Sequence, residues 1–253
     1  MEETMHKGEI FKALRKIRGY ESKEEDYTYS ISEDYATITS YTGTTTNILI
    51  PEELGGYPVK TIGSEAFRNN KTLEKVYLSA LVTSIGSRAF QNCIALTDIK
   101  MSNLFTTIGT SAFEGCDGLT EVTLSDSVQN INDYAFRYCD NLVKINYPKS
   151  WKSAGNAIFG GCTKLTSIVV PEGVTSIPSY AFYGMTSLTN ITLPSTLTNI
   201  GYQSFQGCSG LVEVTIPDSV HTISDYAFRY CENLEKINYP KSWKSAGNAI
   251  FGG

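Results

Sequence analysis

Six cysteines are the residues of this 253-residue chain with the most obvious capacity for chemistry, because in an extracellular protein they would first suggest disulfides. They recur at multiples of 23 residues, as Cys93, Cys116, Cys139, Cys162, Cys208 and Cys231. If each occupies the same place in a stacked coil, neighbouring thiols lie roughly 4.8 Å apart in a ladder. Their Cβ vectors then run parallel rather than toward one another, which disfavours pairing. We therefore expect buried, unpaired thiols.

Metal-binding and catalytic residues are sparse in this sequence. Its only histidines are His6, in the N-terminal tail, and His221, at an expected exposed bend. There is no C-x₂-C pair or Cys/His cluster to bind zinc, and neither histidine has a nucleophile or an acid at a suitable spacing. The glycines form no phosphate-binding loop. The sequence predicts no enzymatic activity, no metal site and no cofactor.

The residues that must position the cysteines belong to a repeat of constant length. A phenylalanine returns every 23 residues without insertion or deletion, at Phe67, Phe90, Phe113, Phe136, Phe159, Phe182, Phe205, Phe228 and Phe251. A strict period of this size predicts a solenoid, in which each coil buries its apolar side against its neighbours.

Within one repeat, apolar and variable positions alternate over a few residues, as in Glu121-Val122-Thr123-Leu124. This alternation predicts a short strand with one buried side. The Ala-Phe-x-x-Cys segment is too short for a full helix, and we expect a single helical or 3₁₀ turn there.

The whole unit, Leu-x-x-Ile-x-Leu-Pro-x-x-Val-x-x-Ile-Gly-x-x-Ala-Phe-x-x-Cys, resembles the BspA-like leucine-rich repeat family of bacterial and protist surface proteins over about residues 48–253. The resemblance implies an α/β fold: a curved leucine-rich repeat solenoid with parallel strands on its concave face and short helical or 3₁₀ turns on its convex side. It also implies an adhesive or protein-binding role in a secreted or surface-anchored protein. The family has no shared catalytic residues to carry over.

The sequence divides into three parts. Residues 1–26 hold a helical pattern at 8–19 and a charged linker. Residues 27–60 should form an N-terminal cap, a β-hairpin over 27–41 followed by an irregular first coil with five extra residues. Residues 61–253 form the solenoid. The 8–19 segment has two interpretations, a helix packed on the first coil or one that binds a partner or a membrane surface.

A longer repeat is superimposed on the short one. Residues 133–161 return at 225–253, 92 residues or four coils later, with only two differences. In both copies three core positions change together, and in the first copy these are Trp151, Ala154 and Ile158. A large residue beside a small one conserves core volume. The alternative is an aromatic ligand site built on Trp151.

Composition and chain ends restrict the partners. The net charge of −5 and pI of about 5.2 argue against nucleic acid, and no apolar stretch is long enough for a membrane span. The start lacks the pattern of a signal peptide. The protein is therefore cytoplasmic, or it is secreted or displayed at the cell surface and its leader has been removed. The end after Phe251 predicts a fragment of a longer protein or a surface for self-association.

The remaining candidate site is the exposed side of the predicted strands, a ribbon of about 40 Å suited to a protein or an extended peptide. Its alternative interpretation is a merely soluble face, in a structural spacer or an intracellular interaction scaffold. The candidate binding residues are Lys75, Tyr77, Asp98, Lys100, Glu121, Thr123, Lys144, Asn146, Asn190, Thr192, Glu213, Thr215, Lys236 and Asn238.

Overall fold

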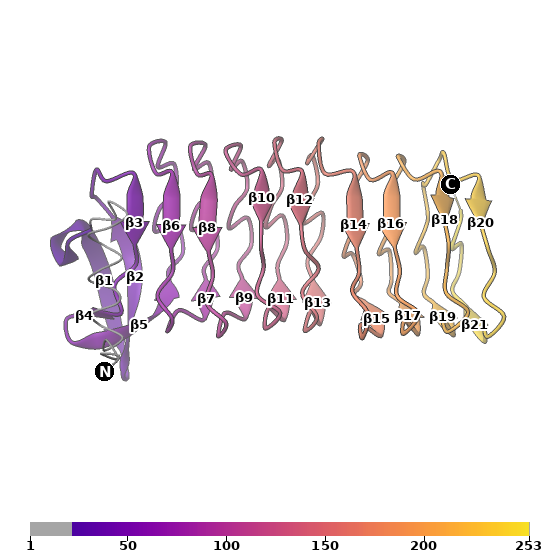
Figure 1. Ribbon diagram of the computed structural model, residues 1–253, viewed down its shortest axis with the longest axis horizontal. Helices are drawn as coiled ribbons and strands as arrows, with labels where there is room; N and C mark the ends of the chain where they lie inside the picture. The colour runs from indigo at the N-terminus through magenta and orange to yellow at the C-terminus, as the bar shows by residue number, and fades with distance from the viewer. Residues whose placement is uncertain (1–21, 253) are drawn as a thin grey trace, which may run out of the picture.

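The computed structural model describes residues 22–252, so the helical pattern at 8–19 and His6 lie outside the described residues. A short 3₁₀ helix, η1 (Glu24–Asp26), leads into the hairpin expected from the sequence. Its strands β1 (Tyr27–Ser32) and β2 (Tyr35–Tyr41) pair antiparallel. From there the chain winds into coils that follow one another along a nearly straight line in the view of Figure 1.

A first strand row runs along one side of the coils, where the sequence predicts it (Figure 1). Neighbouring strands that pair do so in parallel, with partners 23 residues apart, such as Lys75 and Asp98. In most of these strands the central Ile or Val is buried and its neighbours face outward. The row comprises β3 (Asn47–Leu49), β6 (Lys75–Tyr77), β8 (Asp98–Lys100), β10 (Glu121–Val122), β12 (Lys144–Ile145), β14 (Ser167–Val169), β16 (Asn190–Thr192), β18 (Glu213–Val214) and β20 (Lys236–Ile237).

A second strand row was not predicted. It forms where each repeat carries Ile before Gly, because the buried Ile fixes a two-residue strand against the next coil. It comprises β5 (Tyr57–Ile62), β7 (Ser84–Ile85), β9 (Thr107–Ile108), β11 (Asn130–Ile131), β13 (Ser153–Ala154), β15 (Ser176–Ile177), β17 (Asn199–Ile200), β19 (Thr222–Ile223) and β21 (Ser245–Ala246). The row is continuous except between β13 and β15.

The predicted helical or 3₁₀ turn at Ala-Phe-x-x-Cys is wrong. Among residues 22–252 the only helix is η1. In the coil at Phe90, alternate N–H groups bond differently: that of Phe90 donates to Ala112 O of the next coil at 2.8 Å, whereas that of Gln91 closes a local turn on Arg88 O. Arg88 and Asn92 have φ of 56° and 59°, which breaks any helical run. Bonding to the next coil therefore replaces the helix.

The core is a set of columns of like residues. Phe67, Phe90, Phe113, Phe136 and Phe159 stack ring on ring, with centroids 4.8–5.8 Å apart. All five are at most 3 % exposed, and the leucine and Ile/Val columns beside them are buried along most of the stack. This is the arrangement that equal coil lengths predict, since like residues lie above like.

At the N-terminal end the first coil departs from the rest. β3 pairs in parallel with β6, as a strand of a first coil should. The extra residues form a second hairpin, in which β4 (Glu53–Leu54) pairs antiparallel with β5 around Gly55 and Gly56. β2 pairs in parallel with β5, so the 27–41 hairpin extends the second strand row at its N-terminal edge.

Candidate functional site

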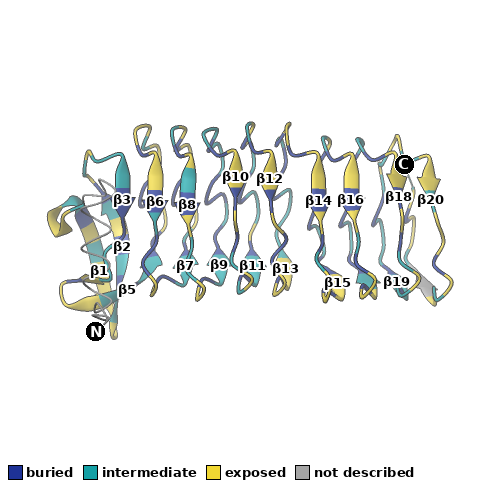
Figure 2. Ribbon diagram, viewed as in Figure 1, coloured by how far each residue is buried: buried dark blue, intermediate teal, exposed yellow. Residues whose placement is uncertain are grey.

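The fourteen candidate residues all lie at outward positions in or beside the first strand row. Twelve are exposed, while Tyr77 and Asp98 are half-buried. Figure 2 shows the exposed positions of the row on either side of buried ones. Period-2 alternation causes this, because each strand turns its central Ile or Val inward. The row therefore presents a continuous line of side chains to solvent.

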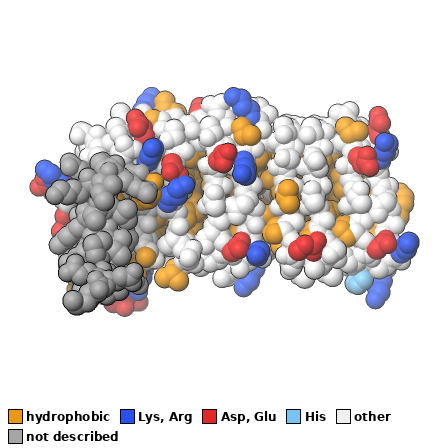
Figure 3. Space-filling model, viewed as in Figure 1, with side chains coloured by type: hydrophobic (Ala, Val, Ile, Leu, Met, Phe, Trp, Pro, Cys, Tyr) orange, Lys and Arg blue, Asp and Glu red, His pale blue; other side chains and the backbone are white. Residues whose placement is uncertain are grey.

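The charges on this row are balanced. Lys144 lies 3.9 Å from Glu121 of the preceding coil, and Lys236 lies 3.8 Å from Glu213. Lys100 pairs with Asp98 on its own strand at 3.0 Å. Figure 3 likewise shows acidic and basic side chains beside one another rather than gathered into a patch of one sign. A surface of this kind favours recognition by shape and local hydrogen bonds over attraction to a highly charged partner.

Two of the candidates have a structural role. Asn146 accepts from the Leu124 N–H at 2.7 Å and donates to the Leu124 carbonyl at 2.9 Å. Asn238 makes the same two contacts with Ile216. These amides complete the backbone hydrogen bonding of the preceding coil, which leaves them less available to a partner.

Two hollows lie along the row. One, of about 510 Å³, is lined by Thr123 and Asn146 together with Met101, Asn103 and Asp126. The other, of about 360 Å³, is lined by Glu213, Thr215, Lys236 and Asn238. Sequence reasoning missed Met101, Asn103 and Asp126, whose contribution depends on how consecutive coils meet. The one signal was the atypical turn at Asn103, between the strand and Phe105.

The prediction of unpaired, buried thiols is confirmed, with Cys231 half-buried. Each thiol donates to the carbonyl of the residue 26 positions earlier, as Cys116 Sγ does to Phe90 O at 3.1 Å. Burial raises the pKa of Cys93 and Cys231 to about 12 and that of Cys116 well above its ordinary value. The cysteines are therefore protonated donors between coils, a role that their spacing alone did not reveal.

Trp151 lies in the core, 6 % exposed. Its ring packs against Tyr147 and meets Phe182 edge-on, and its Nε1 donates to Ser153 O at 2.8 Å. This arrangement supports the volume-compensation interpretation. Over residues 22–252 no three His, Cys, Asp or Glu side chains gather as metal ligands, and no helix is long and apolar enough to span a bilayer.

Comparison with known proteins agrees with this fold. The sequence profile of the BspA type leucine rich repeat region matches residues 37–166 and 152–253, in six copies. Among curated proteins no match was found. A leucine rich repeat protein of T. pallidum is similar in structure, with a TM-score of 0.68 and 28 % identity over 76 % of this chain and 90 % of that one.

Two further solved structures are less similar. A leucine rich cell surface protein from Faecalibacterium prausnitzii has a TM-score of 0.47 and 24 % identity over 90 % of this chain and 94 % of its own. Pneumococcal vaccine antigen PcpA has a TM-score of 0.37 and 16 % identity over 90 % and 84 %. Because both TM-scores lie below 0.5, the argument depends on the repeat profile and the T. pallidum structure. On those two findings, this chain belongs to the BspA type leucine-rich repeat family.

Proposed function

We propose that this chain is a non-enzymatic protein-binding module and that the first strand row is its binding surface. The observation that carries the proposal is the line of exposed outward side chains along nine stacked strands. Within the described structure no hydrogen bond or ion pair engages the side chains of Lys75, Thr123, Asn190, Thr192 or Thr215, so they are available to a partner. Extended solenoid surfaces of this kind commonly bind proteins.

The role we propose is adhesion to a host or matrix protein, by a parent protein that is secreted or held at the cell surface. Membership of the family supports this role. The balanced charge of the row fits a folded protein or an extended peptide better than a polyanion. Val169, 64 % exposed at an outward position of β14, adds an apolar contact to the row.

A structural spacer is the second candidate. Its support is that several outward side chains already satisfy one another, as in the Lys144–Glu121 pair and the bonds of Asn146 to Leu124. In that case the repeats set a distance and another part of a longer chain binds.

Surface plasmon resonance against immobilised fibronectin, laminin and collagen separates the two candidates. The test variant carries Lys100→Ala, Thr123→Ala, Thr192→Ala and Thr215→Ala on the first strand row. We expect its affinity for a protein that the parent chain binds to fall at least about tenfold, as when contact residues are truncated.

The matched control carries Gln129→Ala, Lys152→Ala, Thr175→Ala and Thr198→Ala, beside the second strand row, and should bind like the parent chain. Circular dichroism of both variants shows whether the fold is kept. Equal binding by the folded test variant, or no binding by the parent chain, contradicts the proposal and favours the spacer.

A further inference from the structure

One interface between successive coils lacks the backbone hydrogen bonds found at its neighbours. Between residues 143–161 and 166–184, here called the joint, no backbone hydrogen bond of the described structure passes from one coil to the next. At the preceding interface such bonds are regular: the N–H groups of Lys152 and Gly155 donate to Gln129 O and Ile131 O at 2.8 and 2.7 Å. The joint is also where the second strand row breaks, between β13 and β15.

Pro178 explains the first lost bond. The equivalent residue is usually a glycine whose N–H donates to the preceding coil, as Gly201 does to Ile177 O at 3.0 Å. Proline has no N–H to donate. A Cβ alone does not cause the loss, because Asn132 and Ser224 occupy the same repeat position and still donate at 3.0 Å.

Met185 explains a second loss. At this position six repeats carry a cysteine whose thiol donates across the stack, including Cys162 to Phe136 O at 3.0 Å and Cys208 to Phe182 O at 3.1 Å. Methionine has no S–H, so the equivalent donation to Phe159 O is missing. Two different residues thus remove donors at one interface.

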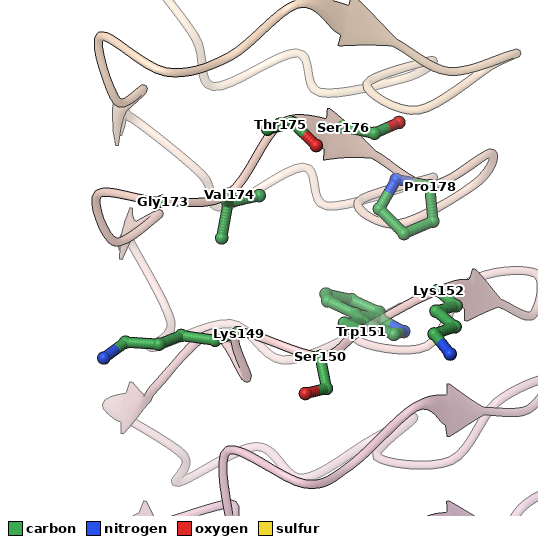
Figure 4. Close-up of a pocket in the computed structure, with 9 residues that line it drawn as sticks. All are labelled: Lys149, Ser150, Trp151, Lys152, Gly173, Val174, Thr175, Ser176 and Pro178. Carbon is green, nitrogen blue, oxygen red and sulfur yellow. The ribbon is translucent and has the colours of Figure 1, made fainter.

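The aromatic column is interrupted at the same place. Phe159 and Phe182 make no ring contact in the described structure, and Phe182 instead meets the edge of Trp151 at 6.1 Å. A cavity of about 340 Å³ lies here. Figure 4 shows Val174 and Pro178 on one of its walls and Trp151 on the other. A side-chain bond, Tyr147 Oη to Ser176 O at 3.3 Å, crosses the joint.

We propose that the solenoid is articulated at the joint, so that residues 27–161 and 166–252 move as two rigid blocks. Each block is joined internally by repeated backbone donors, whereas the joint depends on apolar contacts and few side-chain bonds. Apolar contacts are non-directional and tolerate sliding and tilting, whereas a ladder of short hydrogen bonds does not. The motion changes the angle between the two halves of the first strand row and unfolds neither half.

Pulsed electron paramagnetic resonance on the full chain tests this with two matched label pairs on the first strand row. Lys75→Cys with Lys144→Cys lies within the first block, and Lys144→Cys with Glu213→Cys spans the joint. Both pairs are three coils apart, and the unsubstituted chain gives the background from native thiols. We expect the distance distribution across the joint to be at least about twice as broad. Equal widths overturn the proposal.

A restoring variant tests the cause. Pro178→Gly with Met185→Cys returns both donors, and the spanning pair should narrow to the width of the pair within the block. Ser224→Gly is the matched control, because it makes the same position glycine where the donor already exists, and it should change nothing. Pro178→Gly alone serves if the double variant does not fold. A spanning distribution that stays broad in the folded restoring variant contradicts the role assigned to these donors.

Discussion

The interface at Phe113 and Phe136 and the joint at Phe159 and Phe182 are built from the same 23-residue repeat and are held differently. The first has stacked rings 5.2 Å apart, a thiol donor and backbone bonds along both coils. The second has a tryptophan edge, a methionine and a proline. In a solenoid the energy of each interface is a local term. A regular repeat therefore does not imply uniform strength along the stack.

The largest expected effect is that of alkaline pH on the thiol ladder. Burial raises the pKa of Cys93 and Cys231 to about 12, above the ordinary value of 9.0, so these thiols ionise first in the unfolded chain. Their stabilisation is complete below pH 9 and is lost as pH rises toward 12, at about 1.4 kcal/mol per pH unit for each thiol. Urea unfolding with reductant at pH 8 and 10 should show a falling midpoint.

The control for this pH effect is a Cys116→Ala, Cys139→Ala variant, whose midpoint should fall less steeply. Similar slopes in the two chains would show that other groups cause the pH dependence. The joint itself should add nothing to the slope, because Met185 does not ionise.

Phenylalanine truncation should distinguish the two interfaces by about 1 kcal/mol. Phe113 is stacked on both sides, at 5.4 and 5.2 Å, and Phe113→Ala should cost about 3–5 kcal/mol of unfolding free energy. Phe159 stacks only on Phe136, so Phe159→Ala should cost about 1 kcal/mol less, the typical contribution of one aromatic pair. Urea unfolding followed by circular dichroism measures both. An equal or larger cost at Phe159 would remove the contrast.

Loss of a single thiol donor should have a smaller effect. Cys116→Ala removes the donor to Phe90 O and should cost about 1–2 kcal/mol. Cys116→Ser keeps a hydrogen-bond donor and should recover part of that loss in the same measurement. If alanine and serine are equally destabilising, the contact with the carbonyl is not what stabilises the regular interface.

The smallest effect should come from the surface charges. Lys144 and Glu121 are 3.9 Å apart, with side chains 75 % and 67 % exposed. Their coupling, measured in a double-mutant cycle with alanine, should be at most about 1 kcal/mol. A larger value would mean that surface pairs, rather than backbone and thiol donors, account for the difference between interfaces.

The sequence was sufficient for the features that depend on period. The spacing of Phe113 and its counterparts predicted stacked coils, and the alternation around Val122 predicted the first strand row. The second row was missed because strands of two residues, such as Ser84–Ile85, are too short to show alternation. The helical turn was wrong because its N–H groups bond to a neighbouring coil, which no local pattern reports.

The candidate site was predicted in position more completely than in role. Exposure follows from alternation, so the outward residues could be named in advance. That Asn146 bonds to Leu124, or that Asn103 shares a hollow with Thr123, depends on contacts between different coils. The joint shows the same limit: Pro178 and Met185 are each visible in the sequence, but only stacking brings their effects to one interface.

The bonding of every coil to the next at a fixed offset also governs how such a chain can grow. An inserted residue would shift all later partners on that coil out of register, whereas an added block of whole coils leaves each partner in place. The copied segment obeys this arithmetic, since its offset of 92 residues is four times 23. Gene-level copying in whole coils therefore lengthens the protein without disturbing its interior, and the reach of the molecule can change faster than its core.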